Sequence, residues 1–554
     1  MSVASKAPRR RRWRAPNQHG GALVEPAVDV AISHLGSRGE IDGADSVYFC
    51  GIPLSELRRT ARREFIESAW RHTSVYRHDV AADFTDLDRP ILLSGHQPEL
   101  FHTGVWFKNF VLHDVARRCG AAPIHLNIDN DLCSSVGVRV PAGDLASPHV
   151  DFVAMDQPTP TPVPYEERNI QDPTTFAQFA ENVARRLSSF ANDPILCSLW
   201  PVVLDQIAET QNIGELLSRS RHQLEATWGL ETCEMPLSTA CDTDTFRRFA
   251  LEILRNAESF AQTYNAILAD YRQRHRLRSR THPVPNLAIE SDWIETPFWV
   301  WTTDQPQRMR LFASYADGCL RLQGRSTHHG LAPSSTVSVL LPADSECDGA
   351  AYDAALETWR HWRHGGLKIR PRALMTTLYS RLFVGDLFLH GIGGSKYDEM
   401  TDELSRRFFA VQPPPYMTVT ATFKLPVSVP PVADDDVRRI DGELRELWYH
   451  PEKYVTEAGA TDPAESAQLA ANKRQLVNDP SPPERRKWRH DRITEVNDQL
   501  RQRVSPLRDV LLEEQSSLVD QLSAAHLLES REFSFCLFSE ETLRKPMIQL
   551  ARRS

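Results

Sequence analysis

Polar residues with reactive side chains follow two short apolar stretches in the first part of the chain. The first stretch leads into His96, Gln97 and His102, and the second leads into Asp129 and Asp131. Imidazoles can donate hydrogen bonds to phosphate or transfer protons near neutral pH, and glutamine can orient a carboxyl or hydroxyl group. Carboxylates can bind a substrate amine, or Mg²⁺ that is held with phosphates. We therefore expect the two histidines to be catalytic, and the glutamine and the two aspartates to bind substrate.

The elements that position these residues are expected to form a strand–helix–strand unit. Residues 91–94 predict a buried strand, residues 105–118 a helix that Gly120 ends, and residues 123–128 a second strand. Such a unit makes the two strands parallel, and parallel sheets bind ligands at the carboxyl ends of their strands. The polar residues stand at those two ends.

A second strand, glycine-rich segment and helix are predicted further along the chain, over residues 382–390, 391–396 and 397–409. Glycines let backbone N–H groups close on an anion, and a helix N-terminus and a lysine add positive charge. The segment does not have the Gly-x-x-x-x-Gly-Lys pattern of a P-loop, and a tight turn that merely needs glycine is the alternative. We expect Lys396 to be catalytic and Arg372 to bind substrate. The nucleotide-binding residues expected here are Gly391, Gly393, Gly394 and Ser395.

Composition favours an ordinary globular protein of the reducing cytoplasm. The chain has 554 residues, of which 41% are hydrophobic and 25% charged, with a net charge of -9. This acidic balance argues against a surface built for nucleic acid, and no apolar run approaches the ~18 residues of a membrane span. The nine cysteines are scattered and include no Cys-x-x-Cys pair, which argues against a disulfide framework and a structural zinc site.

The order of segments predicts an α/β protein with a Rossmann-like parallel sheet core, an inserted connective region and a C-terminal α-helical coiled coil. Three β-like runs, 308–313, 318–323 and 336–341, suggest a sheet in the insert, and the Pro-rich residues 141–175 suggest a linker. The predicted parts are a disordered basic tail (1–20), a helical extension (21–85), the core's first part (86–225), the insert (226–365), the core's second part (366–430) and the helical coiled-coil domain (431–554).

A narrow apolar seam supports the C-terminal coiled coil. Its residues, spaced by three or four, are Ile493, Val496, Leu500, Val504, Leu507 and Leu511. Pro506 should kink or end a helix within this seam. The seam can be buried in a homodimer or in an intramolecular helical hairpin.

The first loop resembles that of a known family, the cysteine-adding enzymes (cysteine ligases) of bacillithiol biosynthesis. The residues that carry the resemblance are Gly95, Gln97, Leu100-Phe101 and Thr103-Gly104. The acidic run at 129–131 and the arginines, strand and Gly-Gly turn at 370–394 are similar to later parts of the family. His96 stands where the family usually has glutamine, and Glu99 where it has glycine.

The resemblance implies a core of the class I aminoacyl-tRNA synthetase type, in which two loops hold ATP. It implies a ligase that joins an amino acid, cysteine in the family, to an amine acceptor. ATP with Mg²⁺ would be the cofactor, Gly95 and Gly104 would bind the nucleotide, and the C-terminal helices would form a homodimer. The first loop lacks the last histidine of the His-x-Gly-His pattern, and Gly394-Ser395-Lys396 matches only part of the Lys-Met-Ser-Lys-Ser pattern.

The sequence alone leaves two other functional hypotheses open. A catalytically degenerate protein of the same fold would act as a dimeric nucleotide-binding or scaffold protein, and the incomplete loops favour it. A metal-dependent hydrolase would use the histidines and aspartates of the first unit as ligands. Neither a membrane nor a nucleic acid is expected as a partner.

Overall fold

A computed structural model describes most of the chain. The described residues are 13–35, 41, 43–80, 86, 89–133, 136–145, 147–279, 283–316, 318–326, 336–340, 349–458, 462–480 and 482–554. The arginine-rich run of the expected basic tail, residues 9–12, lies outside them.

The core is a six-stranded, mostly parallel sheet, as the sequence predicts. Its spatial order is β1-β17-β16-β4-β5-β10, and only β1 pairs antiparallel, against β17. Its strands are β1 (Gly21–Glu25), β4 (Ile91–His96), β5 (Ala122–Asn127), β10 (Cys233–Pro236), β16 (Leu387–His390) and β17 (Tyr416–Thr422). The chain runs outward from β4 through β5 to β10, then returns to the other side of β4 as β16 and β17. The strand order therefore reverses between β4 and β16.

The predicted first strand and helix are confirmed, with small shifts at their ends. Residues 91–94 are all buried, and alternate side chains of β4 face opposite cores: Leu93 packs with the α2 side, and Leu92 with the α3 side. Helix α3 (Thr103–Cys119) ends at Gly120, which adopts the left-handed conformation with φ 66° that glycine accepts without strain. The two strands β4 and β5 pair in parallel, which completes the expected strand–helix–strand unit.

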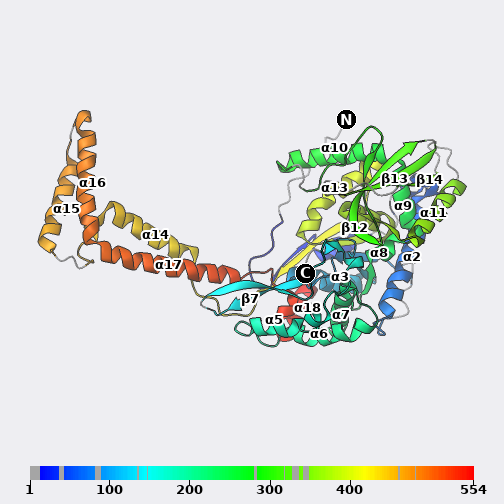
Figure 1. The fold of residues 1–554 in the computed structure, drawn as a ribbon, viewed down its shortest axis with the longest axis horizontal. Coiled ribbons are helices and arrows are strands. Elements are labelled where there is room, and N and C mark those ends of the chain that lie inside the picture. The colour runs from blue at the N-terminus through cyan, green and yellow to red at the C-terminus, as the bar shows by residue number, and fades with distance from the viewer. Residues whose placement is uncertain are drawn as a thin grey trace.

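Helices cover both faces of this sheet and pack around the insert (Figure 1). They are α1 (Val28–Ser33), α2 (Leu54–Ser74), α4 (Pro173–Ala177), α5 (Phe179–Leu187), α6 (Ile195–Asp205), α7 (Ile213–Thr227), α8 (Leu237–Cys241), α9 (Asp244–Arg255), α10 (Ala257–His275), α11 (Gly349–His364), α12 (Ala373–Tyr379), α13 (Ile392–Phe408) and α18 (Glu540–Arg553). A π-helical turn, Ser380–Val384, occupies the start of the strand predicted at 382–390, so that strand is shorter than expected.

The insert and the strand that directly follows it form an antiparallel sheet of five strands in the order β14-β13-β12-β11-β15. Its strands are β11 (Ile294–Thr302), β12 (Gln305–Ala316), β13 (Cys319–Arg325), β14 (Val337–Leu340) and β15 (Leu367–Pro371). The three β-like runs of the sequence fall on β12, β13 and β14. Part of the predicted linker is instead a two-stranded ribbon, formed by β7 (Gly137–Gly143) and β8 (Pro148–Ala154).

Four helices form an arm that projects from the body (Figure 1). They are α14 (Asp434–Tyr449), α15 (Pro463–Asn478), α16 (Arg486–Arg503) and α17 (Ser505–Leu528). Helix α14 pairs with α17, and α15 with α16. The predicted seam is interrupted, because α16 ends at Arg503 and Pro506 lies in the first turn of α17. The arm is thus built of two helical pairs of one chain, and a continuous coiled coil is not confirmed. Within the described residues, no helix has both the length and the apolarity to cross a membrane.

Candidate functional site

A cavity of about 550 Å³ opens at the point where the strand order reverses. It is lined by the carboxyl end of β4 and the start of α3 on one side, and by the end of β16 and the start of α13 on the other. Open parallel sheets bind ligands at such a reversal because the two flanking loops diverge there. The two segments singled out in the sequence therefore face the same cavity.

The first loop contributes Gly95, His96, Gln97, His102 and Gly104 to the cavity wall. The Nδ1 atom of His96 lies 3.2 Å from the carbonyl oxygen of Gln97. Burial, followed by the nearby charge of Lys108, lowers the pKa of His96 to about 3. This imidazole is therefore neutral at physiological pH, so it serves as a neutral hydrogen-bonding group rather than as a cation.

His102 caps α3, which fixes the direction of its ring. Its Nδ1 atom accepts a hydrogen bond from the backbone N–H of Gly104 at 3.1 Å. Its Nε2 atom lies 3.7 Å from a carboxylate oxygen of Glu532. Burial lowers the pKa of His102, against the raising effect of Glu532. One nitrogen is used in the cap, and the other faces the cavity side.

Lys108 is a site residue that the sequence reasoning missed. Its side chain is buried, it lines the cavity, and Nζ donates to the carbonyl oxygen of Gly95 at 2.8 Å. Burial, and then the like charge of Arg221, lowers the pKa of Lys108 to about 7. The sequence contains a feature that could identify it, because Lys108 interrupts the apolar stripe of the predicted helix, four residues before the buried Leu112. An anion bound in the cavity would favour the charged form of this lysine.

The second segment differs from its prediction, because the glycines belong to the helix. Helix α13 begins at Ile392 with Gly391 as its N-cap, so Gly393 and Gly394 lie in its first turn. The Ser395 N–H and hydroxyl both donate to the Gly391 carbonyl oxygen, which stabilises this early start. No side chain caps the helix. The free N–H groups of its first turn border the cavity and provide an anion-binding end.

His390 is a second missed residue. It lines the cavity at the end of β16, and Nε2 lies 2.7 Å from a carboxylate oxygen of Asp398. Asp398 is also paired with the buried Arg381 at 3.0 Å. The carboxylate holds the imidazole in one orientation, so that Nδ1 is turned toward Gly394 and the cavity wall.

Several expected residues have other partners or lie elsewhere. Asp129 accepts hydrogen bonds from the backbone and hydroxyl of Ser238, and Arg372 pairs with Glu295 at 2.7 Å. Lys396 is exposed and is not among the residues that line the cavity. The buried Ser395 bonds within the fold.

Asp131 is connected to the cavity only through Gln97. Its carboxylate accepts a hydrogen bond from the Gln97 amide at 2.8 Å and pairs with Arg308 at 3.0 Å. Gln97 itself lines the cavity, so Asp131 orients a residue that a ligand can touch.

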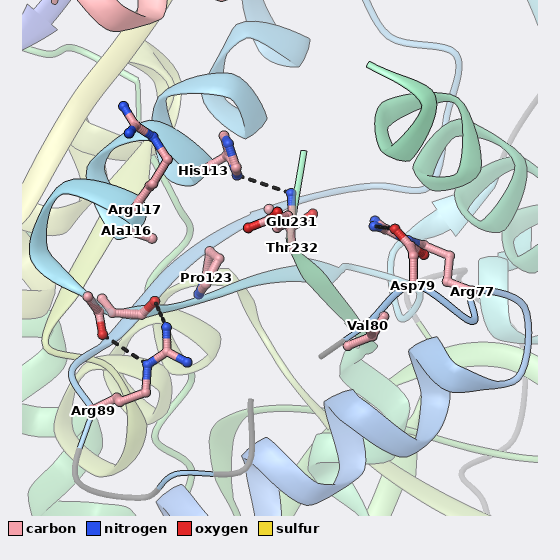
Figure 2. A pocket seen from close by; sticks show the side chains of 12 residues that line it. Arg77, Asp79, Val80, Arg89, His113, Ala116, Arg117, Pro123, Glu231 and Thr232 are labelled. Atoms are coloured by element: carbon pink, nitrogen blue, oxygen red, sulfur yellow. Dashed lines mark hydrogen bonds and ion pairs between the residues drawn. The ribbon is translucent and has the colours of Figure 1, made fainter. Parts of the chain in front are cut away.

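A smaller hollow of about 310 Å³ lies at the opposite end of the sheet (Figure 2). Pro123 and Thr232, near the amino ends of β5 and β10, border it. Its basic groups already have partners: Arg89 donates to two backbone carbonyls, and Arg77 is paired with Asp79 at 2.6 Å. It lies away from the carboxyl ends of the strands, where parallel sheets place their ligands.

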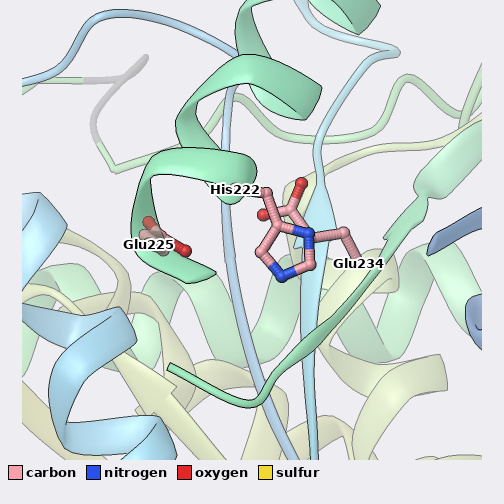
Figure 3. Close-up of side chains that lie close together, drawn as sticks. All are labelled: His222, Glu225 and Glu234. Carbon is pink, nitrogen blue, oxygen red and sulfur yellow. The ribbon is translucent and has the colours of Figure 1, made fainter. Parts of the chain in front are cut away.

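A buried polar cluster behind α3 contains His222, Glu225 and Glu234 (Figure 3). Among the described residues it is the one group whose ligand atoms are close enough to share a metal ion. Arg221 is paired with both carboxylates, at 2.7 Å to Glu225, and so supplies the positive charge that the carboxylates require. The metal-dependent hydrolase hypothesis requires such a group from His96, His102, Asp129 and Asp131, and these residues do not form one.

The geometry thus gives one polar, cation-bearing cavity at the sheet's reversal point. Comparison of the sequence with protein-family models and with curated proteins finds no match, so no family membership is shown for this chain.

Proposed function

We propose that the cavity binds the phosphates of ATP and that the protein is an ATP-dependent ligase. The observation that carries the proposal is the buried Lys108, which faces the same cavity as the uncapped N-terminus of α13. Helix N-termini and buried lysines both stabilise phosphate oxygens. Two such groups on opposite walls favour an elongated, multiply charged anion such as a nucleotide triphosphate.

The reaction we propose forms a carbon–nitrogen bond in two steps. A carboxylate oxygen of an amino acid attacks the α-phosphorus of ATP, and pyrophosphate leaves. An amine then attacks the acyl carbon, AMP leaves, and the amine loses a proton. Lys108 and the α13 terminus would stabilise the charge on the phosphates, and Gln97 would orient the amino acid. His390, held by Asp398, would accept the proton of the amine.

The resemblance to cysteine-adding enzymes supports cysteine as the amino acid and a C-terminal homodimer. Mg²⁺ would accompany the ATP phosphates. The described cysteines form no disulfide, which is in keeping with a proposed cytoplasmic location.

A non-catalytic protein of the same fold is the second candidate. The specific observation in its favour is that Lys396, the expected catalytic lysine, is exposed outside the cavity. Such a protein would bind the nucleotide without consuming it.

Release of pyrophosphate from ATP, measured with each standard amino acid in turn, separates the two candidates. The ligase predicts pyrophosphate release that depends on one amino acid. In His390→Gln, ATP binding and the first turnover of release should remain, whereas the further release that an added amine supports should be lost, because His390 acts in the second step. Binding of ATP without pyrophosphate release for any amino acid, with or without an added amine, would favour the non-catalytic protein.

A further inference from the structure

We propose that Arg531, from the segment that follows the arm, binds the phosphate chain of the ligand in the cavity. The inference rests on the proposed nucleotide site and adds to it a residue about 430 positions away from the first loop in sequence.

The segment is fixed against the first loop by backbone contacts. It joins α17 to α18, and the N–H of Phe535 donates to the carbonyl oxygen of Phe101 at 3.0 Å. Ser534 forms an isolated bridge with His102. These contacts place Arg531 at the mouth of the cavity, together with Glu532.

The guanidinium group of Arg531 is only partly used by the protein. Nη2 donates to the hydroxyl of Thr420 at 2.8 Å. Nε and Nη1 are enclosed, and within the described part of the chain neither has a hydrogen-bond partner. Nε is 3.5 Å from the carboxylate of Glu532, whose side chain is 63% exposed, so this ion pair is open to water. Enclosed N–H groups without partners are costly unless a ligand supplies an acceptor.

Gly104 gives Arg531 the room to reach this position. A Cβ atom on Gly104 would lie 2.5 Å from the carbonyl oxygen of Ala421 and 2.8 Å from the Thr420 hydroxyl, and it would overlap Nη2 of Arg531. The glycine at the start of α3 is therefore required by the close approach of Arg531 and β17. The guanidinium group of Arg531 thus lies against the first turn of α3, the helix that also contains Lys108.

The charges of the cavity wall identify the ligand's chemistry. Among the described residues that line it, Lys108 and Arg531 are the lysine and arginine, and Glu532 is the one acidic residue. Together with the α13 N-terminus, these positive groups outnumber the one negative group of the cavity wall. A chain of phosphates matches several separated positive groups, whereas a single carboxylate would pair with one of them.

The test is calorimetric titration of the full-length protein with three probes: ATP with Mg²⁺, pyrophosphate with Mg²⁺, and adenosine. The variants are Arg531→Gln and Arg531→Lys, and the control is Arg544→Gln, an exposed arginine of α18 paired with Glu540. We expect Arg531→Gln to weaken ATP and pyrophosphate binding about 10- to 100-fold, with Arg531→Lys intermediate. Adenosine binding and the control should be unchanged.

The outcomes separate this inference from the proposed function. Equal pyrophosphate affinity of the wild type and Arg531→Gln overturns the role of Arg531, even if ATP binds. Arg531-dependent binding of pyrophosphate without any binding of ATP keeps the inference and overturns the nucleotide. Circular dichroism and the melting temperature show whether each variant is folded; if Arg531→Gln is not, the Arg531→Lys series decides by the same criteria.

Discussion

We propose that Lys108 binds phosphate, and its burial also lowers the stability of the folded protein at neutral pH. Its pKa falls from 10.5 to about 7 because the folded protein buries its ammonium group. Below pH 7 both the folded and the unfolded chains carry the charge, and the folded state bears the full desolvation penalty. As the pH rises from 7 to 10.5, only the unfolded chain keeps the proton, so this penalty disappears and stability rises.

Lys108→Met should therefore stabilise the protein while impairing the site. We expect the free energy of unfolding at pH 7 to rise by about 1–3 kcal/mol, with a smaller gain at pH 9. Urea unfolding at the two pH values measures both. Lys473→Met is the matched control, because Lys473 is equally buried but is paired with Glu452. The Lys473→Met variant should be less stable than the wild type. If Lys108→Met also loses stability, buried Lys108 does not destabilise the folded protein.

Asp129 should change stability with pH in the opposite direction to Lys108. Burial raises its pKa from 3.8 to about 7, so the folded state holds a proton that the unfolded state has lost in that pH interval. Its contribution to stability is therefore largest at acidic pH and is lost as the pH rises through 7.

Asp129→Asn removes this titration and keeps an acceptor for the Ser238 N–H, while the Ser238 hydroxyl would accept a hydrogen bond from the new amide nitrogen. We expect a gain on the order of 2 kcal/mol at pH 8 and little change at pH 4.5, measured by urea unfolding. ATP binding should persist, since the carboxylate is bonded to Ser238 instead of facing the cavity. Loss of ATP binding in this variant would restore the substrate-binding role expected from the sequence.

At the scale of elements, the start of α13 shapes one wall of the cavity. A Cβ on Gly394 would lie 2.7 Å from Nδ1 of His390, whereas a Cβ on Gly393 would meet nothing within 4 Å. Gly394 therefore has no room for a side chain beside His390, whereas Gly393 does.

Alanine at each position separates helix stability from site geometry. Gly393→Ala should stabilise the protein by about 0.5 kcal/mol through helix propensity. Gly394→Ala must displace His390 and should lower the rate of ligation about 10-fold or more, with the helix content unchanged. Equal rates for Gly394→Ala and the wild type would show that the orientation of His390 is irrelevant to the reaction.

The elements that could be predicted are those whose signals are local. The apolar run at 91–94 and the amphipathic stretch before Gly120 identify β4 and α3 without further information. The predicted start of α13 is five residues too late, because glycines favour loops unless nearby groups stabilise the turn, as Ser395 does here. Strand β1 could not be foreseen, since its pairing partner β17 lies almost 400 residues later.

The dependence on local signals also explains which site residues could be predicted. Gly95, His96, Gln97, His102 and the glycines of the second segment were predictable because they border strands of one sheet. Arg531 was not, since only the folded chain brings the segment after the arm against the first loop.

At the scale of the whole molecule, the arm is stabilised by few buried side chains and exposes several apolar ones. One small cluster consists of Ile440, Leu447, Val504 and Leu511, and Ala470, Val496 and Leu500 of α15 and α16 are also buried. Exposed apolar residues include Trp448, Val510, Leu512 and Val519. Exposed apolar side chains on a projecting element favour an interface with a second copy.

Val510→Glu combined with Leu512→Glu should convert the proposed dimer into a monomer. Light scattering of the wild type should give a dimer mass, and the double variant half of it. Val75→Glu, at an equally exposed valine of the body, is the control and should leave the dimer intact. A monomer mass for the wild type would remove the dimer from the proposal and leave the arm as a pair of intramolecular hairpins.

We propose that the cavity between β4 and β16 holds a nucleotide. Calorimetric titration of the wild type and Lys108→Gln with ATP and Mg²⁺ tests it most directly. We predict saturable binding of one ATP per chain in the wild type, and an affinity at least about 10-fold weaker in Lys108→Gln, because a buried charge-assisted contact is lost. The absence of ATP binding to the wild type, or an unchanged affinity in the variant, would contradict the claim.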